Sequence, residues 1–186
     1  RVFREKEREQ EKALTVEAAG MNEKNVVLIG MPGAGKSTVG VVLAKLLGYR
    51  FLDSDLLIQE REGRLLCEII EEKGLDGFLQ IEEEVNASVQ AVRTVIATGG
   101  SAVYGARAME HLREIGTVIY LRLPYAEIAS RVGDVKQRGI ALKEGQNLKE
   151  LYGERCPLYE TYADIIVDTK GISIEKLAKM LAEFIK

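Results

Sequence analysis

A glycine-rich stretch near the start of the chain, GMPGAGKST at residues 30–38, constrains the fold more than any other feature. The apolar run NVVLIG precedes it and VGVVLAKLLG follows it, a pattern that predicts a strand, a loop and a helix. The spacing from Gly30 to Lys36 and Ser37 is typical of a phosphate-binding loop, in which glycines let several backbone N–H groups point into one concavity. A glycine-rich turn that binds nothing would not require this strand before it and this helix after it. We therefore expect a nucleoside triphosphate here, with Lys36 at the terminal phosphates and Ser37 at Mg²⁺.

Composition limits the other classes of protein. The chain has 186 residues and a formal net charge of −3, which favours one domain with a sizeable core and argues against nucleic acid as a partner. No apolar run is long enough to predict a membrane span. The N-terminus is a charged run without a signal peptide, and Cys67 and Cys156 lack metal-binding spacing. We expect free thiols and a cytoplasmic location.

Residues 1–20 differ from the rest of the chain. They mix charges of both signs without a continuous apolar face, which predicts a solvated extension or linker. The chain does not begin with Met, and Met21 stands just before the first predicted strand. We expect a single domain to occupy residues 21–186, as a monomer or as part of a longer polypeptide.

From residue 22 onward, predicted strands alternate with predicted helices. The strands are expected at residues 26–30, 49–53, 94–100, 117–123 and 164–168. One helical region is expected from 55 to 72, a break at 73–77, and a helix interrupted by Pro157 after an unpatterned, mobile segment at about 133–147. The alternation predicts an α/β fold, a parallel sheet with helices on both faces, whose ligands bind at the carboxyl ends of the strands.

Two aspartates follow the second predicted strand. Asp53 and Asp55 are two residues apart, so both side chains can face one crevice at the strand end. One could bind Mg²⁺ together with Ser37, and the other could accept hydrogen bonds from substrate hydroxyls and act as a base. The alternative is that Asp55 only caps the next helix.

Glycines and arginines mark the other strand ends. Gly99 and Gly100 would allow close backbone approach to a ligand, or would form a plain tight turn. Arg131 and Arg138 flank or lie in the unpatterned segment, where an arginine could stabilise charge on a transferred phosphoryl group. Arg155 could grip a carboxylate with its guanidinium fork. The alternative is a solvated surface charge for Arg131 and Arg138, and a helix-surface ion pair for Arg155.

Several stretches taken together resemble the shikimate kinases, a family of P-loop proteins related to nucleoside monophosphate kinases. These stretches are LIGMPGAGKSTVG, FLDSD, EII…GLDGF…IEEEV, VIATGGSAV and ERCPLYETYADIIVDT, in this order from about residue 22 to the C-terminus. The resemblance implies a three-layer fold with a five-stranded parallel sheet in the order 2-3-1-4-5 and a mobile lid. It also implies transfer of the γ-phosphate of ATP to the 3-hydroxyl of shikimate, with ATP and Mg²⁺ as cofactors.

The resemblance further implies a role for each matching residue. Lys36, Asp55 and Arg138 would be catalytic. Ser37 and Asp53 would hold Mg²⁺, and Asp55 would orient or deprotonate the attacking hydroxyl. Gly99 and Gly100 would approach the substrate through their backbone, and Arg155 would bind its carboxylate. Arg131 would lie by the adenine and Arg138 on ATP. The phosphates would lie against Gly33, Ala34, Gly35, Lys36, Ser37 and Thr38.

Leu79 departs from the family pattern. The family typically has Phe-Arg where this chain has Phe78-Leu79, and that arginine is the second jaw of the carboxylate clamp. Ser101 replaces the third glycine of the family. These departures leave open a shikimate kinase with weak acceptor binding, a clamp relocated to Arg61 or Arg64, and a kinase for a different small hydroxylated acceptor. Two other classes are a catalytically reduced nucleotide-binding regulator and a P-loop ATPase acting on nucleic acid.

Overall fold

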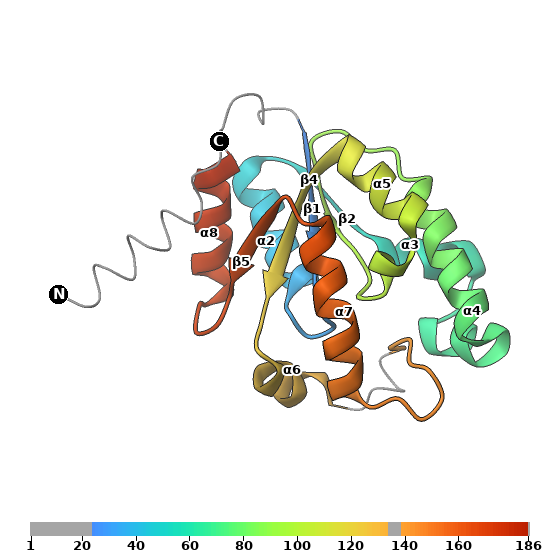
Figure 1. Cartoon of the computed structure of the whole chain (residues 1–186). Helices are drawn as coiled ribbons and strands as arrows, with labels where there is room; N and C mark the ends of the chain where they lie inside the picture. The colour runs from blue at the N-terminus through green and yellow to red at the C-terminus, as the bar shows by residue number, and fades with distance from the viewer. Residues whose placement is uncertain (1–23, 134–138, 186) are drawn as a thin grey trace.

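The centre of the molecule is a five-stranded parallel β-sheet, seen in the computed structural model of the chain (Figure 1). Its strand order, β2-β3-β1-β4-β5, confirms the order that the family resemblance implies. The structure describes residues 24–133 and 139–185, so the charged extension at 1–20 and Arg138 lie outside the described residues. The strands are β1 (Asn25–Ile29), β2 (Arg50–Asp53), β3 (Thr94–Ala97), β4 (Gly116–Arg122) and β5 (Ile165–Asp168).

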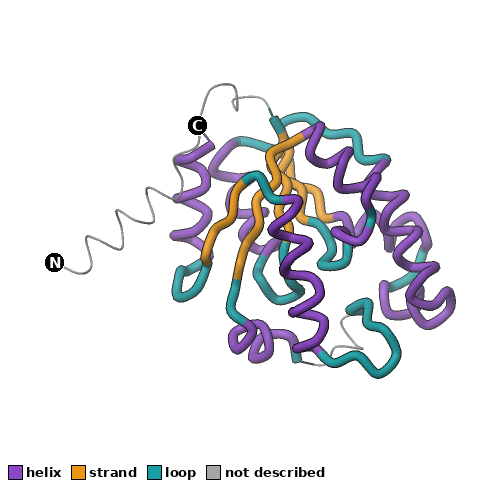
Figure 2. The backbone as a smooth tube through the Cα atoms, viewed as in Figure 1, coloured by secondary structure: helices purple, strands orange, loops and turns teal. Residues whose placement is uncertain are grey.

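Helices cover both faces of this sheet. The helices α2 and α8 lie on one face and α5 and α7 on the other, so the three-layer α/β prediction is confirmed (Figures 1 and 2). The helices are α2 (Lys36–Leu47), α3 (Ser54–Glu62), α4 (Leu66–Ala87), the 3₁₀ turn η1 (Ala102–Tyr104), α5 (Ala106–Ile115), α6 (Tyr125–Val132), α7 (Leu148–Tyr162) and α8 (Ile174–Ile185).

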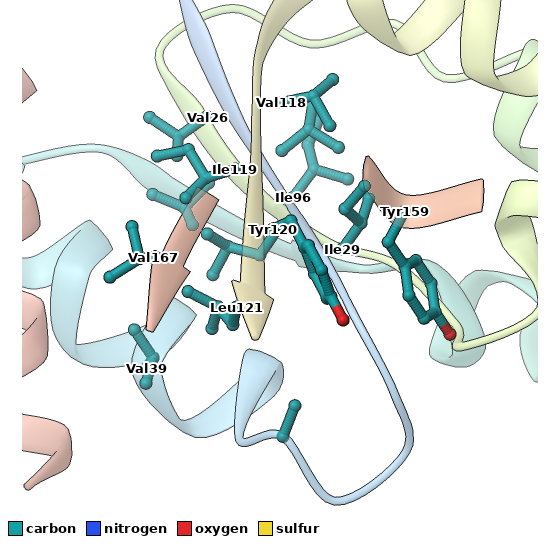
Figure 3. Packing of buried hydrophobic residues seen from close by; sticks show 14 of the residues in the cluster. Val26, Ile29, Val39, Ile96, Val118, Ile119, Tyr120, Leu121, Tyr159 and Val167 are labelled. Carbon is teal, nitrogen blue, oxygen red and sulfur yellow. The ribbon is translucent and has the colours of Figure 1, made fainter. Parts of the chain in front are cut away.

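The central strands form the hydrophobic core because both of their faces are covered by helices. Every residue of β1 is buried, which explains why the run NVVLI lacks the alternation of a half-exposed strand. Tyr120 of β4 and Tyr159 of α7 pack with their ring centroids 5.0 Å apart (Figure 3). Both rings are buried, and the Tyr159 hydroxyl donates a hydrogen bond to the carbonyl oxygen of Gly100 at 2.6 Å. The core therefore reaches the loop that follows β3.

The helical region after β2 differs from the prediction. A single helix over 55–72 is wrong, because Gly63 adopts a left-handed conformation and ends α3. The break expected at 73–77 is only a kink at Gly74, whose φ of 69° and ψ of 178° are not helical. The helix resumes directly and continues to Ala87 as α4.

Pro157 does not interrupt α7. A proline removes one backbone N–H from a helix, yet α7 continues for another turn to Tyr162. The Thr161 hydroxyl donates to the Pro157 carbonyl at 2.8 Å, and buried Tyr159 anchors this turn to the sheet. Tertiary packing outweighs the local penalty.

Candidate active site

A cavity of about 560 Å³ lies at the carboxyl ends of the strands, where the α/β pattern predicts a ligand. The phosphate loop, α3, α4, the loop after β3, α6, the segment after Gly139 and α7 all contribute to its wall. The lining residues are Pro32, Gly33, Gly35, Lys36, Ser37, Thr38, Asp55, Leu66, Phe78, Thr98, Gly99, Gly100, Ser101, Arg131, Gly139, Ile140, Ala141 and Arg155.

The phosphate loop curls between β1 and α2 as its glycines predict. Gly33 and Gly35 have φ angles of 83° and 90°, a region that glycine enters without strain. The N–H of Ala34 donates to the carbonyl of Met31 at 3.1 Å and closes the turn. Ala34 is itself buried and does not line the cavity, whereas Gly33 and Gly35 do.

Lys36 is the first residue of α2 and is only 8% exposed. Its ammonium group donates to the carbonyl oxygens of Gly30 and Met31 at 2.8 and 3.0 Å, which spans the loop from inside. Burial lowers the pKa of Lys36 from 10.5 to about 8, while the nearby carboxylates of Asp55 and Asp53 oppose that shift. Lys36 therefore keeps its charge at neutral pH, as a phosphate-binding lysine requires.

Asp53 connects the phosphate loop to the start of α3. Its Oδ2 accepts a hydrogen bond from the Ser37 hydroxyl at 2.6 Å, and its Oδ1 accepts one from the backbone N–H of Asp55 at 3.0 Å. Asp53 is therefore the N-cap of α3, the role that the sequence left open for Asp55. The Asp55 carboxylate is free from capping and lines the cavity.

Asp55 and Glu82 converge behind Gly99. A Cβ atom placed on Gly99 would lie 2.3 Å from Oε1 of Glu82 and 2.6 Å from Oδ1 of Asp55. Burial, strengthened by the charge of Asp53, raises the pKa of Asp55 from 3.8 to about 6. Burial also raises the pKa of Glu82 from 4.5 to about 7, with the Ser101 side chain opposing the shift. A side chain at position 99 would therefore displace both carboxyl groups.

Glu82 is buried without a paired group. It is 1% exposed, and neither carboxyl oxygen has a hydrogen-bond partner within the described residues. One turn further along α4, the amide of Asn86 donates to the Glu82 backbone carbonyl, and its own Oδ1 is likewise unpaired there. An unpaired buried acid costs stability, so Glu82, which lies behind the lining residues, lowers the free energy of unfolding.

Arg155 of α7 reaches the same wall from the opposite side of the loop after β3. Its Nη1 lies 3.2 Å from the position that a Cβ on Gly100 would take, and the side chain is 1% exposed. Its Nη2 donates to the carbonyl of Ala141 at 2.7 Å, and its Nε donates to the Tyr104 hydroxyl at 3.3 Å. The alternative for Arg155, an ion pair on the helix surface, is therefore excluded, because its side chain is buried at the cavity wall.

The other predicted arginines are placed differently. Arg131 lines the cavity and also pairs with Glu127 in its own helix at 3.1 Å. Arg61 and Arg64 are half-exposed, do not line the cavity, and pair with other residues. Their partners are Glu62 and Glu84 for Arg61, and Glu72 for Arg64.

Leu79 is not in the cavity wall. It packs with Leu57, Leu66 and Ile70 against a small apolar cluster around buried Phe78. Arg61 and Arg64 are also absent from the wall. The cationic residues that line the cavity are Lys36 of the phosphate loop, Arg131 of α6 and Arg155 of α7. Of these, Arg155 is the candidate for binding a carboxylate.

Glu82 and Tyr104 were missed by sequence reasoning. A signal for Glu82 existed, because it falls one turn after Phe78 on the face of α4 that also buries Val85. No sequence pattern identifies Tyr104, whose contacts depend on the approach of η1 to α7.

A phosphate loop on a five-stranded parallel sheet, facing an acid and an arginine across one cavity, defines a P-loop kinase that acts on a small molecule. The sequence matches the shikimate kinase family over residues 32–186. The chain belongs to the shikimate kinase family.

Individual relatives agree with this assignment. A shikimate kinase of Thiobacillus denitrificans is 40% identical over 161 residues, which cover 84% of this chain and 87% of that protein. The structure of a shikimate kinase from Acinetobacter baumannii in complex with shikimate has a TM-score of 0.78 and 36% identity, and covers 87% of this chain and 92% of its own. The Aquifex aeolicus shikimate kinase structure has a TM-score of 0.72 and 31% identity, and the match covers 86% of this chain and 95% of that one. Among the helices of the described segments, none is both long and apolar enough to cross a bilayer.

Proposed function

We propose that this protein transfers the γ-phosphate of ATP to the 3-hydroxyl of shikimate. One observation carries the proposal: Lys36, Asp55 and Arg155 line a single cavity in a chain of the shikimate kinase family. These three groups match the three parts of the substrate pair, which are the phosphates of ATP, the acceptor hydroxyl and the acceptor carboxylate.

The proposed reaction is a direct in-line transfer. Lys36 neutralises charge as the γ-phosphoryl group moves, and Asp55 accepts a hydrogen bond from the attacking hydroxyl and takes its proton. Arg155 holds the acceptor carboxylate through its guanidinium, and the backbone of Gly99 and Gly100 lets the ring approach the wall. Arg138 is a further predicted contributor outside the described residues.

The residues around Ser37 suit Mg²⁺. A hydroxyl oxygen and a carboxylate oxygen of Asp53 lie together at the edge of the phosphate loop, and Mg²⁺ prefers such oxygen ligands. Within residues 24–133 and 139–185, no group of three or more His, Cys, Asp or Glu could hold a metal ion. That fits an ion held by one or two side chains and by substrate phosphates, where it would neutralise phosphate charge.

A second acceptor class is favoured by one specific observation. Leu79 leaves Arg155 without the second jaw that the family uses, and Arg61 and Arg64 do not replace it. A small hydroxylated molecule that needs only one cation is therefore the alternative acceptor.

ADP release measured with ATP alone, with shikimate, and with polyols of similar size tests both proposals. We expect release to depend on shikimate. If ADP release depends only on another polyol, that polyol is the acceptor in place of shikimate. If ADP release does not depend on any acceptor, the protein is an ATPase. Nucleotide binding without any release would identify a regulator.

A further inference from the structure

Tyr104 contacts the guanidinium of Arg155 both with its hydroxyl and with its ring, and the proposed reaction assigns no role to these contacts. The Nε of Arg155 donates to the Tyr104 hydroxyl at 3.3 Å, and the guanidinium carbon lies over the Tyr104 ring, 5.2 Å from its centroid. An arginine stacked on an aromatic face is held both by electrostatic attraction and by restriction of its rotamers.

The direction of the Tyr104 hydroxyl bond is fixed by a carboxylate. The hydroxyl donates its single proton to Oε1 of Glu154, so only its lone pairs remain to accept from Arg155. Burial and the Glu154 carboxylate raise the pKa of Tyr104, which keeps that proton in place. Hydrogen bonds from Lys143 and Tyr104 lower the pKa of Glu154, which keeps it an acceptor.

Glu154 is held in turn from the segment before α7. Its Oε2 accepts from the ammonium of Lys143 at 2.8 Å and from the side-chain amide of Gln146 at 3.0 Å. Each polar group in this chain of contacts therefore has a partner, in contrast to Glu82.

The bonds to Tyr104 and Ala141 determine which part of Arg155 can meet a ligand. A guanidinium has five N–H donors, and here Nε–H and one N–H of Nη2 are occupied. The remaining donors are those of Nη1, which lies at the cavity wall by Gly100, and the second N–H of Nη2. This end of the fork can still take a carboxylate with two parallel bonds.

We infer that Tyr104 is a positioning residue for acceptor binding, which turns the Nη1 end of Arg155 toward the carboxylate of the acceptor. Because Leu79 supplies no second jaw, a single arginine must be held in the correct orientation before the acceptor arrives. Preorganisation of this kind reduces the ordering cost of binding. The inference rests on the proposed function and specifies how this chain recognises the acceptor.

The test compares Tyr104→Phe with Tyr104→Leu. The first keeps the ring and removes the hydroxyl, and the second removes both. We expect Tyr104→Phe to raise the KM for shikimate about fivefold to tenfold and Tyr104→Leu to raise it further, with kcat and the KM for ATP unchanged. Tyr152→Phe is the matched control, because it removes a tyrosine hydroxyl bond in α7, to the carbonyl of Leu123, outside the cavity.

A second substrate separates positioning from general damage. An analogue with a neutral carboxamide in place of the carboxylate gains little from an oriented guanidinium, so Tyr104→Phe should affect it by less than about twofold. An equal loss for shikimate and for the carboxamide would overturn the inference, as would an unchanged KM for shikimate. A lower melting temperature with unchanged KM would assign Tyr104 a purely structural role.

The outcome for the unmodified protein distinguishes this inference from the proposed function. Turnover of shikimate by the unmodified protein with no effect of Tyr104→Phe refutes only the positioning role. If the unmodified protein binds shikimate without turnover, the phosphotransfer proposal fails, and calorimetric Kd values for the same variants then test Tyr104. Absence of both binding and turnover refutes both.

Discussion

Three polar side chains on the phosphate side of the cavity have hydrogen-bond partners, whereas the buried carboxyl group behind the acceptor side has none within the described residues. Lys36 and Ser37 each donate to a neighbouring group, and both oxygens of Asp53 are used. On the acceptor side, Glu82 is 1% exposed and has no partner within the described residues, and Leu79 stands where the family resemblance implies an arginine. The phosphate side follows a motif that constrains backbone and side chains together, whereas on the acceptor side Leu79 differs from the residue that the family resemblance implies.

The largest effect is expected on the phosphate side. Lys36→Ala should lower kcat/KM about a thousandfold, because it removes a buried charge aimed at the transferred group. The melting temperature should also fall by a few degrees, because two hydrogen bonds from the ammonium group to loop carbonyls are lost. Steady-state ADP release measures this effect, and Lys45→Ala, on an exposed position of the same helix, is the control. Near-normal turnover by Lys36→Ala would end the phosphate assignment.

Asp55→Asn should lower kcat about a hundredfold and leave the KM for ATP within about threefold. The amide keeps the shape of the side chain but cannot take the proton of the acceptor hydroxyl. Because Asp53 caps α3, the melting temperature should stay nearly constant. An unchanged kcat would remove Asp55 from the chemistry.

Leu79→Arg should give the acceptor side the arginine that the family resemblance implies. The new guanidinium lies one turn before unpaired Glu82 on α4 and can offer a second jaw, so the KM for shikimate should fall about tenfold to a hundredfold. The KM for ATP should not change. Leu56→Arg adds the same charge at an exposed position of α3 and should change neither.

Loss of packing at Leu79 is a competing effect, because this side chain contacts an apolar cluster. Melting temperature must therefore be measured beside the kinetics. A variant that folds normally without any gain in shikimate KM would show that the single-arginine clamp is not what limits binding.

The smallest effect is expected from Glu82→Gln, and it depends on pH. Burial raises the pKa of Glu82 from 4.5 to about 7, so the folded chain holds this proton more tightly than the unfolded chain. The stabilisation is complete below pH 4.5 and is lost as the pH rises through 7. Glutamine cannot ionise, so it avoids this loss at high pH. The melting temperature of Glu82→Gln minus that of the unmodified protein should therefore be a few degrees larger at pH 8 than at pH 5.

Thermal unfolding at the two pH values measures this difference, which corresponds to on the order of 2–3 kcal/mol at most. Glu71→Gln, at an exposed position of the same helix, is the control for removing one carboxylate from α4. If the difference in melting temperature is the same at pH 5 and pH 8, Glu82 is ionised in the folded protein at both pH values.

The phosphate side of the cavity could be predicted from the sequence better than the acceptor side. The strand order and the conformation of Gly33 and Gly35 follow from local motifs and from the family resemblance, and the structure bears them out. The burial of Glu82 was readable from its place on the apolar face of α4, although its lack of a partner was not. The contact of Tyr104 with Arg155 joins η1 to α7 across the fold, and no local pattern determines such a distant pairing.

The hydrogen bond from Tyr159 to Gly100 has a consequence for engineering. The ring of Tyr159 packs on Tyr120 in the centre of the core, while its hydroxyl holds the carbonyl of a residue that lines the cavity. A library of variants restricted to residues of the cavity wall would leave this contact unchanged. Conservative changes of core volume around these two rings would shift the Gly100 loop, and so provide a route to altered acceptor selectivity with every wall residue left in place.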